Sequence, residues 1–348
     1  MAVSARTLVN TRFDPARLSA PVGDAEAFHA ALPGYAPTPL RPLEALAREL
    51  GLGAVAVKDE SRRLGLPAFK VLGASWAVER ALARETGVRW LVAASAGNHG
   101  RAVAHVAAGR GLRCRVFLPA RSVAARRQAI ADEGADVVVV DGSYEDAVAR
   151  AAEEGRRDGA LEIADVGASG PAAWVIDGYA TLFAEAARQG RFDVVLVPVG
   201  VGSLAAAAAR FAAHAEGPVR VIGVEPVAAA CLTASLAAGA PTAVATPGTG
   251  MAGMDCAEVS AAAWPSLLHG IAGTVTVDDA EALAGQRELA GAGLVVGECA
   301  GAPVAALRAL VADPETAWLR EAVGLGPESR VLLLATEGPT GTASVSSV

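Results

Sequence analysis

Short aliphatic runs alternate with alanine-rich stretches along most of the chain, and this alternation limits the folds open to it. The aliphatic runs lie at 54–57, 90–94, 115–118, 136–140, 194–197, 219–224, 274–277 and 331–335. The alanine-rich stretches lie near 73–85, 98–109, 122–132, 143–155, 178–190, 203–215, 278–291 and 301–312. Continuous apolar runs of this length are typical of buried parallel strands, which crossover helices connect. The pattern predicts a doubly wound α/β fold with mostly parallel sheets.

The N-terminal part of the chain lies outside this alternation. Residues 1–35 show no periodic pattern, and we expect them to be irregular. Leu43, Leu46 and Leu50 fall on one helical face, which predicts a helix over 39–50 that ends at the following glycine.

Lysine is rare in this chain. Its 30 basic residues include only two lysines, Lys58 and Lys70. A lysine amine can be tuned to lose its proton and can then form a Schiff base with an aldehyde, whereas an arginine guanidinium stays charged. Lys70 lies on a predicted loop between an aliphatic run and a helical stretch. It is therefore the candidate reactive residue, if other segments build a site around it.

Two glycine-containing turns follow predicted strands and precede predicted helices. They lie at 94–100, with the sequence Ala-Ser-Ala-Gly-Asn-His-Gly, and at 199–204, with the sequence Val-Gly-Val-Gly-Ser-Leu. Loops at the carboxyl ends of parallel strands collect ligands in open α/β sheets. The backbone N–H groups of such turns can bind a phosphate or a carboxylate.

The second turn also satisfies the pattern G-x-G-x-x-A over 200–205, and the next aliphatic run ends at Glu225. These features are typical of a nicotinamide-dinucleotide site, which is the alternative interpretation of this turn. That alternative accounts for neither Lys70 nor the turn at 95–100.

Together with Lys70, the two turns resemble the fold-type II family of pyridoxal-phosphate (PLP) enzymes. This family includes threonine dehydratases, cysteine and threonine synthases and diaminopropionate ammonia-lyases. The resemblance spans nearly the whole chain and is strongest to the diaminopropionate ammonia-lyase group. It rests on segments 59–62 (Asp-Glu-Ser-Arg), 66–73 (Leu-Pro-Ala-Phe-Lys-Val-Leu-Gly), 178–182, 251–254 (Met-Ala-Gly-Met) and 336–338 (Thr-Glu-Gly). It implies a large PLP-binding domain of residues 1–87 and 169–348 and a small domain of residues 88–168.

The resemblance also implies roles for individual residues. Lys70 would form the imine with the cofactor and act as the catalytic base. The cofactor-binding residues would be Lys70, Asn98 at the phenolic oxygen, Thr336 at the ring nitrogen, Glu298 nearby, and Gly200, Val201, Gly202, Ser203 and Leu204 at the phosphate. The substrate-binding residues would be Ser95, Ala96, Gly97, Asn98, His99 and Gly253. A hydroxyl at the ring nitrogen favours β-elimination and β-replacement over transamination, because it does not hold that nitrogen firmly protonated.

The chain departs from the ammonia-lyase pattern at two places. Ala96 stands where that group typically carries an aspartate, so one face of the substrate lacks this base and we expect an enzyme specific for L-amino acids. Asp165 matches an aspartate of the group, but the tryptophan that follows there is missing. Asp165 is therefore a candidate catalytic residue, and the first suspect for a second base.

The resemblance predicts a PLP-dependent ammonia-lyase that eliminates a β-amino or β-hydroxyl group from a small L-amino acid and yields a 2-oxo acid and ammonia. The alternatives within PLP chemistry are a cysteine synthase-like β-replacement enzyme and a threonine or serine dehydratase. The remaining alternatives are an NAD-binding enzyme and a catalytically inactive PLP-binding scaffold.

Charge and cysteine content bear on partners and location. The net charge of -7 leaves no basic patch for nucleic acid. The early residues carry charges at Arg6, Arg12 and Asp14 without an apolar signal segment, and we expect no membrane association. The widely spaced cysteines predict reduced thiols in a cytoplasmic protein without a metal site. The family resemblance implies a homodimer.

Overall fold

The structure is a computed structural model that describes residues 6–95, 97–120, 122–168 and 170–339 of the chain. Its larger sheet has the strand order β1-β10-β9-β8-β11-β3-β2. These strands are β1 (Thr7–Val9), β2 (Leu40–Pro42), β3 (Ala54–Asp59), β8 (Val194–Pro198), β9 (Arg220–Pro226), β10 (Ile271–Val277) and β11 (Arg330–Ala335). The interior pairs of this sheet are parallel, and only the edge strands β1 and β2 run antiparallel to their neighbours.

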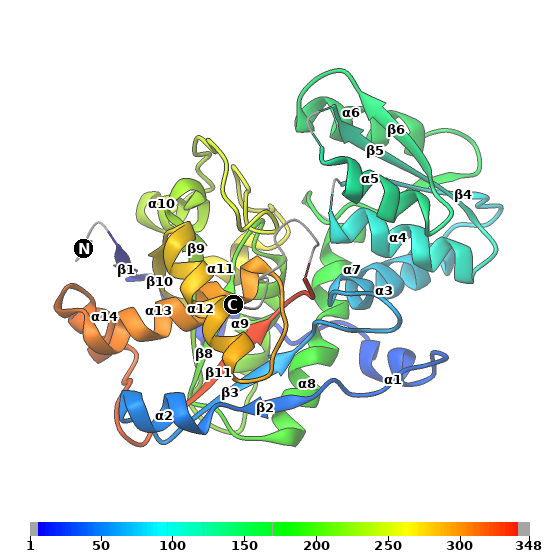
Figure 1. The fold of residues 1–348 in the computed structure, drawn as a ribbon. Coiled ribbons are helices and arrows are strands. Elements are labelled where there is room, and N and C mark those ends of the chain that lie inside the picture. Colours follow the sequence, from blue (N-terminus) through cyan, green and yellow to red (C-terminus); the bar gives the residue numbers. More distant parts are fainter. Residues whose placement is uncertain (1–5, 96, 121, 169, 340–348) are drawn as a thin grey trace.

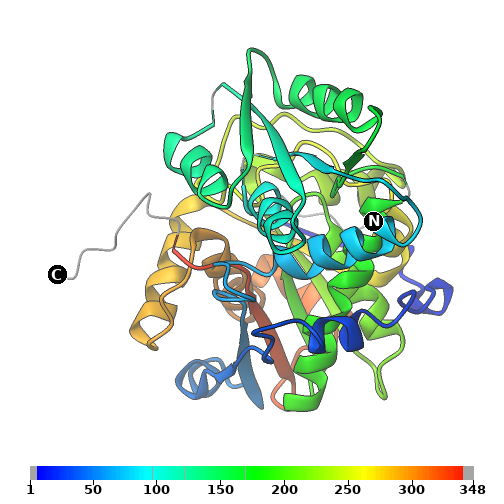
Figure 2. The same cartoon turned by 90° about the vertical axis from the view of Figure 1, so that its right-hand side faces the viewer.

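The second sheet has the order β6-β5-β4-β7, and all of its strands are parallel. Its strands are β4 (Trp90–Ala94), β5 (Arg113–Pro119), β6 (Asp136–Val140) and β7 (Ala160–Glu162). This sheet and its helices form a separate lobe at one end of the molecule, as both cartoon views show (Figure 1, Figure 2). The lobe lies within the predicted small domain, and we retain boundaries at residues 88 and 168 as a proposal.

Helices follow most strands, as the alternation predicts. They are α1 (Ala25–Ala30), α2 (Glu44–Leu50), α3 (Lys70–Leu82), α4 (Asn98–Gly109), α5 (Ala124–Ala131), α6 (Tyr144–Gly155), α7 (Pro171–Gly178), α8 (Ala180–Gln189), α9 (Ser203–Ala213), α10 (Cys231–Ala238), α11 (Trp264–Gly270), α12 (Asp279–Gly291), α13 (Gly301–Ala312) and α14 (Ala317–Ala322). Every predicted strand run and alanine-rich stretch coincides with one of these elements, and the predicted α/β architecture is confirmed. Capping boxes at Ser143 and Asp278 set the starts of α6 and α12.

Helix α3, which carries Lys70 as its first residue, packs closely against α7. A side chain at Gly178 would meet the Leu72 carbonyl oxygen at 2.7 Å and the Gly73 Cα at 2.9 Å. The two backbones can approach only because these positions carry no Cβ. This contact holds the N-terminal end of α3 against the rest of the molecule.

The structure corrects three local predictions. Residues 1–35 are not irregular throughout, because β1 pairs with β10 and α1 forms behind an Asp24 cap. The predicted helix over 39–50 is a short strand, β2, followed by the helix α2 from Glu44. Lys70 lies on the first turn of a helix and not on a loop. The partner of β1 is distant in the sequence, so local periodicity carries no signal of this strand, whereas β2 is a three-residue strand that pairs with the next strand, β3.

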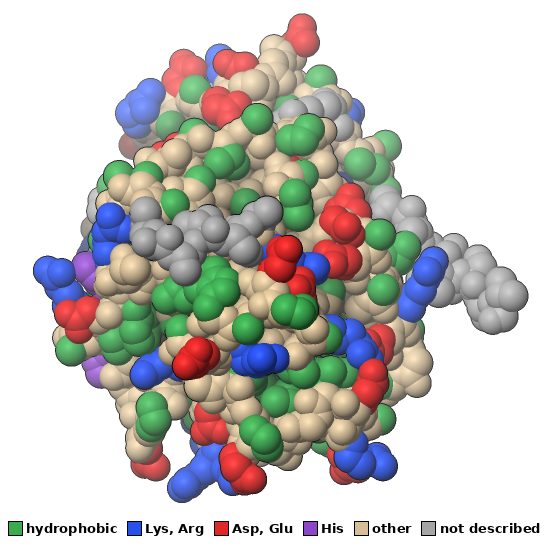
Figure 3. Space-filling view, turned by 90° about the vertical axis from the view of Figure 1, so that its left-hand side faces the viewer, with side chains coloured by type: hydrophobic (Ala, Val, Ile, Leu, Met, Phe, Trp, Pro, Cys, Tyr) green, Lys and Arg blue, Asp and Glu red, His purple; other side chains and the backbone are tan. Residues whose placement is uncertain are grey.

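Surface charges of both signs are interspersed on the face shown in Figure 3. Within the part of the chain that the structure describes, no helix is both long enough and apolar enough to span a bilayer.

Candidate functional site

A cavity of about 960 Å³ is lined by residues that directly follow strands of both sheets. Ser95 follows β4, Gly200 lies just beyond β8, and Thr336 follows β11. Asp165 lies shortly after β7. The cavity therefore lies at the carboxyl ends of parallel strands, where open α/β sheets bind their ligands.

Nearly all of the predicted site residues line this one cavity. They are Lys70, Ser95, Gly97, Asn98, His99, Asp165, Gly200, Val201, Gly202, Ser203, Leu204, Gly253 and Thr336. Two predicted residues differ: Ala96 lies outside the described residues, and Glu298 is not among the described residues that line the cavity. Glu298 instead opens the short turn η3 (Glu298–Ala300), whose buried Cys299 does line it.

Lys70 is placed by the packing of α3 and by the strand end beside it. The Phe69 backbone N–H donates to the Thr336 carbonyl oxygen at 3.3 Å, which ties the start of α3 to the end of β11. The Lys70 Nζ lies 3.0 Å from the Asp165 Oδ2. Burial opposes the charged form of Lys70, but the neighbouring Tyr179 and Asp165 raise its pKa above the usual value. While it is paired with Asp165, Lys70 is therefore an ammonium.

The turn before α9 has the geometry of an anion cradle. Gly202 caps the helix with φ 89°, a left-handed conformation that favours glycine, and no side chain caps the first turn. A side chain at Gly200 would meet the Gly253 carbonyl oxygen at 2.7 Å, so the loop also lies closely against the 250–256 segment. The N-terminus of α9 thus directs backbone N–H groups and positive dipole at the cavity. Its donors fit a phosphate, and Lys70 fits an aldehyde in the same cavity.

The other turn places Asn98 at the start of α4. The Ser95 hydroxyl oxygen accepts a hydrogen bond from the Gly97 N–H at 3.2 Å. The Asn98 Nδ2 donates to the Glu337 Oε2 at 2.7 Å. Asn98 therefore has a carboxylate partner in this structure, although the resemblance implies that its amide binds a cofactor oxygen.

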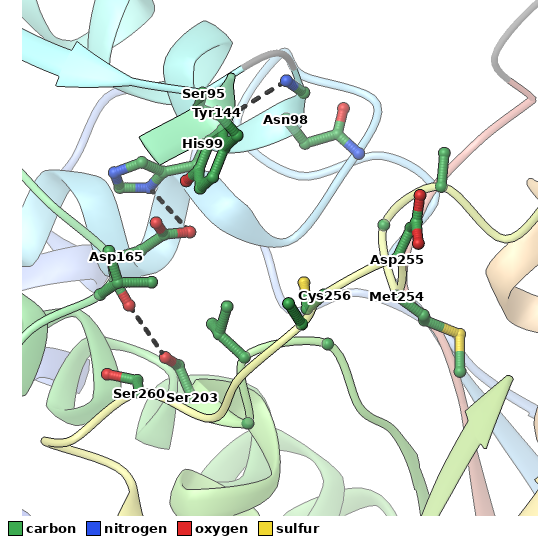
Figure 4. A pocket seen from close by; sticks show the side chains of 18 of the residues that line it. Ser95, Asn98, His99, Tyr144, Asp165, Ser203, Met254, Asp255, Cys256 and Ser260 are labelled. Atoms are coloured by element: carbon green, nitrogen blue, oxygen red, sulfur yellow. Dashed lines mark hydrogen bonds and ion pairs between the residues drawn. The ribbon is translucent and has the colours of Figure 1, made fainter. Parts of the chain in front are cut away.

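Asp165 lies close to both Lys70 and His99, and Figure 4 shows its carboxylate beside the His99 ring. The His99 Nδ1 is 3.8 Å from the same Asp165 Oδ2 that Lys70 contacts. Burial would raise the pKa of Asp165, but His99 and Lys70 beside it lower this pKa to about 2. The Ser203 hydroxyl donates to the Asp165 backbone carbonyl at 3.3 Å, which links this residue to the phosphate-type turn. The carboxylate is thus anionic and contacts Lys70, while Ser203 holds the backbone of the same residue.

Sequence reasoning missed some cavity residues. Glu337 was part of a recognised segment, but its role was not predicted, and burial raises its pKa above the usual value. Tyr144, at the start of α6, donates a long hydrogen bond of 3.4 Å to the Ala94 carbonyl. Cys256 lies close enough to Lys70 and Asp165 for their charges to affect its thiol. For Glu337 the sequence contains one signal, its position beside Thr336 in the segment Thr-Glu-Gly. It contains none for Tyr144 or Cys256.

Comparisons with known proteins agree with this geometry. A family model described as pyridoxal-phosphate-dependent enzyme matches residues 31–337. The diaminopropionate ammonia-lyase of Escherichia coli (strain K12) is 31% identical over 91% of this chain and 88% of its own length. The diaminopropionate ammonia-lyase of Salmonella typhimurium is 33% identical over 90% of this chain and 88% of its own length.

Solved structures of the E. coli enzyme have the same fold. Its complex with an aminoacrylate-PLP azomethine reaction intermediate superposes with a TM-score of 0.87 at 29% identity, covering 96% of this chain and 94% of that one. Its complex with D-serine superposes with a TM-score of 0.86 at 27% identity, with the same coverage of both chains.

Proposed function

The chain belongs to the family of pyridoxal-phosphate-dependent enzymes, and we propose that its substrate is 2,3-diaminopropionate, from which it releases ammonia to give a 2-oxo acid. The predictions of a fold-type II architecture, of PLP as cofactor and of a lyase are confirmed by the family match and by the similarity to diaminopropionate ammonia-lyases. This membership replaces the nicotinamide-binding alternative for the glycine turn at 200–205.

One observation carries the choice of a β-amino substrate: the Asp165 carboxylate lies inside the cavity, 3.0 Å from the Lys70 Nζ. Asp165 is anionic at neutral pH, because its pKa is lowered to about 2 by His99 and Lys70 against the opposing effect of burial. A buried carboxylate requires a positive partner. When the Lys70 amine is engaged by the cofactor, the β-ammonium group of diaminopropionate can occupy the position beside Asp165 Oδ2 that the Lys70 ammonium has left, whereas the hydroxyl group of serine or threonine has no charge to pair with the carboxylate.

The cofactor site can be assigned to residues of this chain. Lys70 would hold the aldehyde carbon, and Asn98 and Thr336 would contact the ring. The backbone of residues 200–204 would hold the phosphate, and Glu298 is retained only as a neighbour of the site. When bound, PLP supplies the electron sink that makes the substrate Cα proton acidic.

The remaining steps belong to protein side chains. The turn at 95–99 would bind the substrate carboxylate beside Gly253, with the Ser95 N–H excepted because it donates to the Phe117 carbonyl oxygen at 3.1 Å. Lys70, as a neutral amine displaced by the substrate, would remove the Cα proton as general base. Asp165 would hold the departing β-amine and supply or accept its proton, since its carboxylate lies on the Lys70 side of the cavity.

A panel of amino acids tests this assignment. The purified enzyme with PLP should release ammonia and pyruvate from L-2,3-diaminopropionate faster than from L-serine or L-threonine. We expect it to turn over the D-isomer of diaminopropionate much more slowly, because Ala96 offers no acid or base. Faster turnover of L-serine or L-threonine would identify a dehydratase, and a thioether product that forms only with added thiol would identify a β-replacement enzyme.

Replacing Asp165 with asparagine should lower kcat/KM for diaminopropionate by roughly 100-fold or more, the range of a lost acid or base group. L-serine turnover, if present, should fall less, since no ammonium is bound there. The matched control is Asp158→Asn, because the side chain of Asp158 is 98% exposed. Ammonia release is measured for both variants. An equal loss of kcat/KM with diaminopropionate and with L-serine would show that Asp165 does not bind the β-amino group.

We also propose that the enzyme is a cytoplasmic homodimer. The family resemblance supports the dimer, and the free cysteines among the described residues are compatible with a reducing compartment. Sedimentation of the full chain over micromolar concentrations tests the assembly, and a monomer throughout would contradict it.

A further inference from the structure

His99 is a buried residue whose ring nitrogens have very different surroundings. Its side chain is 2% exposed, and its Nε2 lies 2.8 Å from the Ile163 carbonyl oxygen. A carbonyl oxygen only accepts hydrogen bonds, so Nε2 must carry a proton. In a neutral ring, Nδ1 is then an unprotonated acceptor.

That acceptor faces a second acceptor. Among the described residues the His99 Nδ1 has no hydrogen-bond partner, and Asp165 Oδ2 lies 3.8 Å away. Figure 4 shows the ring and the carboxylate pointing toward each other. A lone pair and a carboxylate oxygen cannot bond unless a proton lies between them, and a buried polar atom without a partner is costly. One more proton can therefore bind between the His99 Nδ1 and the Asp165 Oδ2.

The charge of Lys70 determines whether this additional proton stabilises the Asp165 carboxylate. Its ammonium contacts the same Oδ2 at 3.0 Å and compensates the carboxylate charge. If Lys70 loses its charge, a buried carboxylate without a cation remains, which is strongly unfavourable. The phenols of Tyr144 and Tyr179 and the thiol of Cys256 cannot supply a positive charge, because these groups are neutral when protonated, and burial raises the pKa of each, so they stay neutral.

We propose that His99 is a positioning residue that accepts a proton on Nδ1 whenever Lys70 becomes neutral, and thereby keeps Asp165 anionic and oriented. Lys70 must lose one proton before its amine can attack an aldehyde. That proton passes from Nζ to Asp165 Oδ2 and on to His99 Nδ1, and it returns by the same path when Lys70 is protonated again. No electrons are transferred, and the proton count of the three groups is unchanged.

The first test is ¹⁵N NMR of the imidazole rings, with His99 identified among the 5 histidines by the loss of its signals in His99→Gln. In the PLP-free wild type at pH 7, His99 should be neutral with its proton on Nε2. In PLP-free Lys70→Met, and in the PLP-loaded wild type, both ring nitrogens should carry protons. Adding Asp165→Asn to Lys70→Met should return the ring to neutral. A ring that stays neutral in Lys70→Met between pH 6 and 8 would overturn the proposal.

The second test measures how fast the visible absorption of the bound cofactor appears when PLP is added to the PLP-free protein. His99→Gln can keep a donor toward Ile163 while it removes the Nδ1 acceptor, and His99→Asn places an amide near the Nδ1 position without a titrating group. We expect the rate to fall about tenfold or more in both, as for a lost proton acceptor, and the thermal midpoint to be retained in His99→Gln, which keeps the donor toward Ile163. Wild-type rates in both variants would contradict the proposal.

The inference rests on the proposed function only in that Lys70 is the reacting amine. Neither readout depends on the amino-acid substrate, so a wrong substrate would leave both results unchanged. A wrong assignment of Lys70 would appear separately, as cofactor bound to another residue.

Discussion

Lys70→Ala is expected to lose all measurable ammonia release, a drop of at least about 10⁴-fold, because one side chain supplies both the covalent attachment and the general base. The purified variant should also lack the visible absorption that wild type acquires with PLP. The measurement combines ammonia release with borohydride reduction and peptide mapping of the wild type, which should place the pyridoxyl group on Lys70.

The matched control for folding is Lys70→Arg. An arginine keeps the positive charge beside Asp165 but cannot become a neutral amine. We therefore expect this variant to be as inactive as Lys70→Ala while retaining the wild-type unfolding midpoint. Activity in either variant, or modification of Lys58, would contradict the assignment.

Lys58, the other lysine, cannot substitute for Lys70, because it is fully buried in a separate network. Its Nζ donates to the Thr38 carbonyl oxygen at 2.7 Å, to Glu185 Oε2 at 2.8 Å and to Gln189 Oε1 at 2.9 Å. Burial lowers the pKa of Lys58, and its contact with Glu185 opposes that shift. The amine therefore has a structural role in which all of its donors are used.

Glu185→Ala is expected to lower the free energy of unfolding by about 3–5 kcal/mol, the range for breaking a buried ion pair. Glu185 accepts from Lys58 and, at 2.7 and 2.9 Å, from Arg63, and all three side chains are at most 1% exposed. Without Glu185, Arg63 keeps its ion pair with Glu60, and Lys58 is left, among the described residues, with the charge of Glu60 nearby and no carboxylate in direct contact. Urea unfolding of variant and wild type measures the difference, and a loss below about 1 kcal/mol would show that the network rearranges.

The matched control is Glu153→Ala, since the Glu153 side chain is 55% exposed and its ion pair with Arg150 should contribute under about 1 kcal/mol. The pH dependence gives an independent check. The pKa of Glu185 is lowered from 4.5 to about 2, because hydrogen bonds and charges of Arg63 and Lys58 outweigh burial. A depressed folded-state pKa means that this stabilisation is complete above pH 4.5 and is lost as the pH falls toward 2. Glu185→Ala should therefore show a weaker acid dependence over that interval.

Much of the fold follows from local sequence. Buried parallel strands require continuous apolar runs, and such runs predicted β3–β6 and β8–β11 without any knowledge of their order. The two glycine turns and Lys70 were recognisable because each depends on a residue type with few substitutes: glycine at φ 89° in Gly202, and a lysine amine for a Schiff base.

Tertiary structure alone decided which residues meet. The edge strand β1 was not predicted, because its pairing energy comes from β10, far along the chain, and β2 was not predicted, because it is only three residues long. Asn98 and Glu337 are separated by 239 positions and still form a 2.7 Å hydrogen bond. Lys70 and Asp165 meet across 95 positions. The spacing of residues along the chain does not show which of them lie close together in space. The crossover connections of the two sheets bring the carboxyl ends of the parallel strands together, and these side chains therefore meet in one cavity.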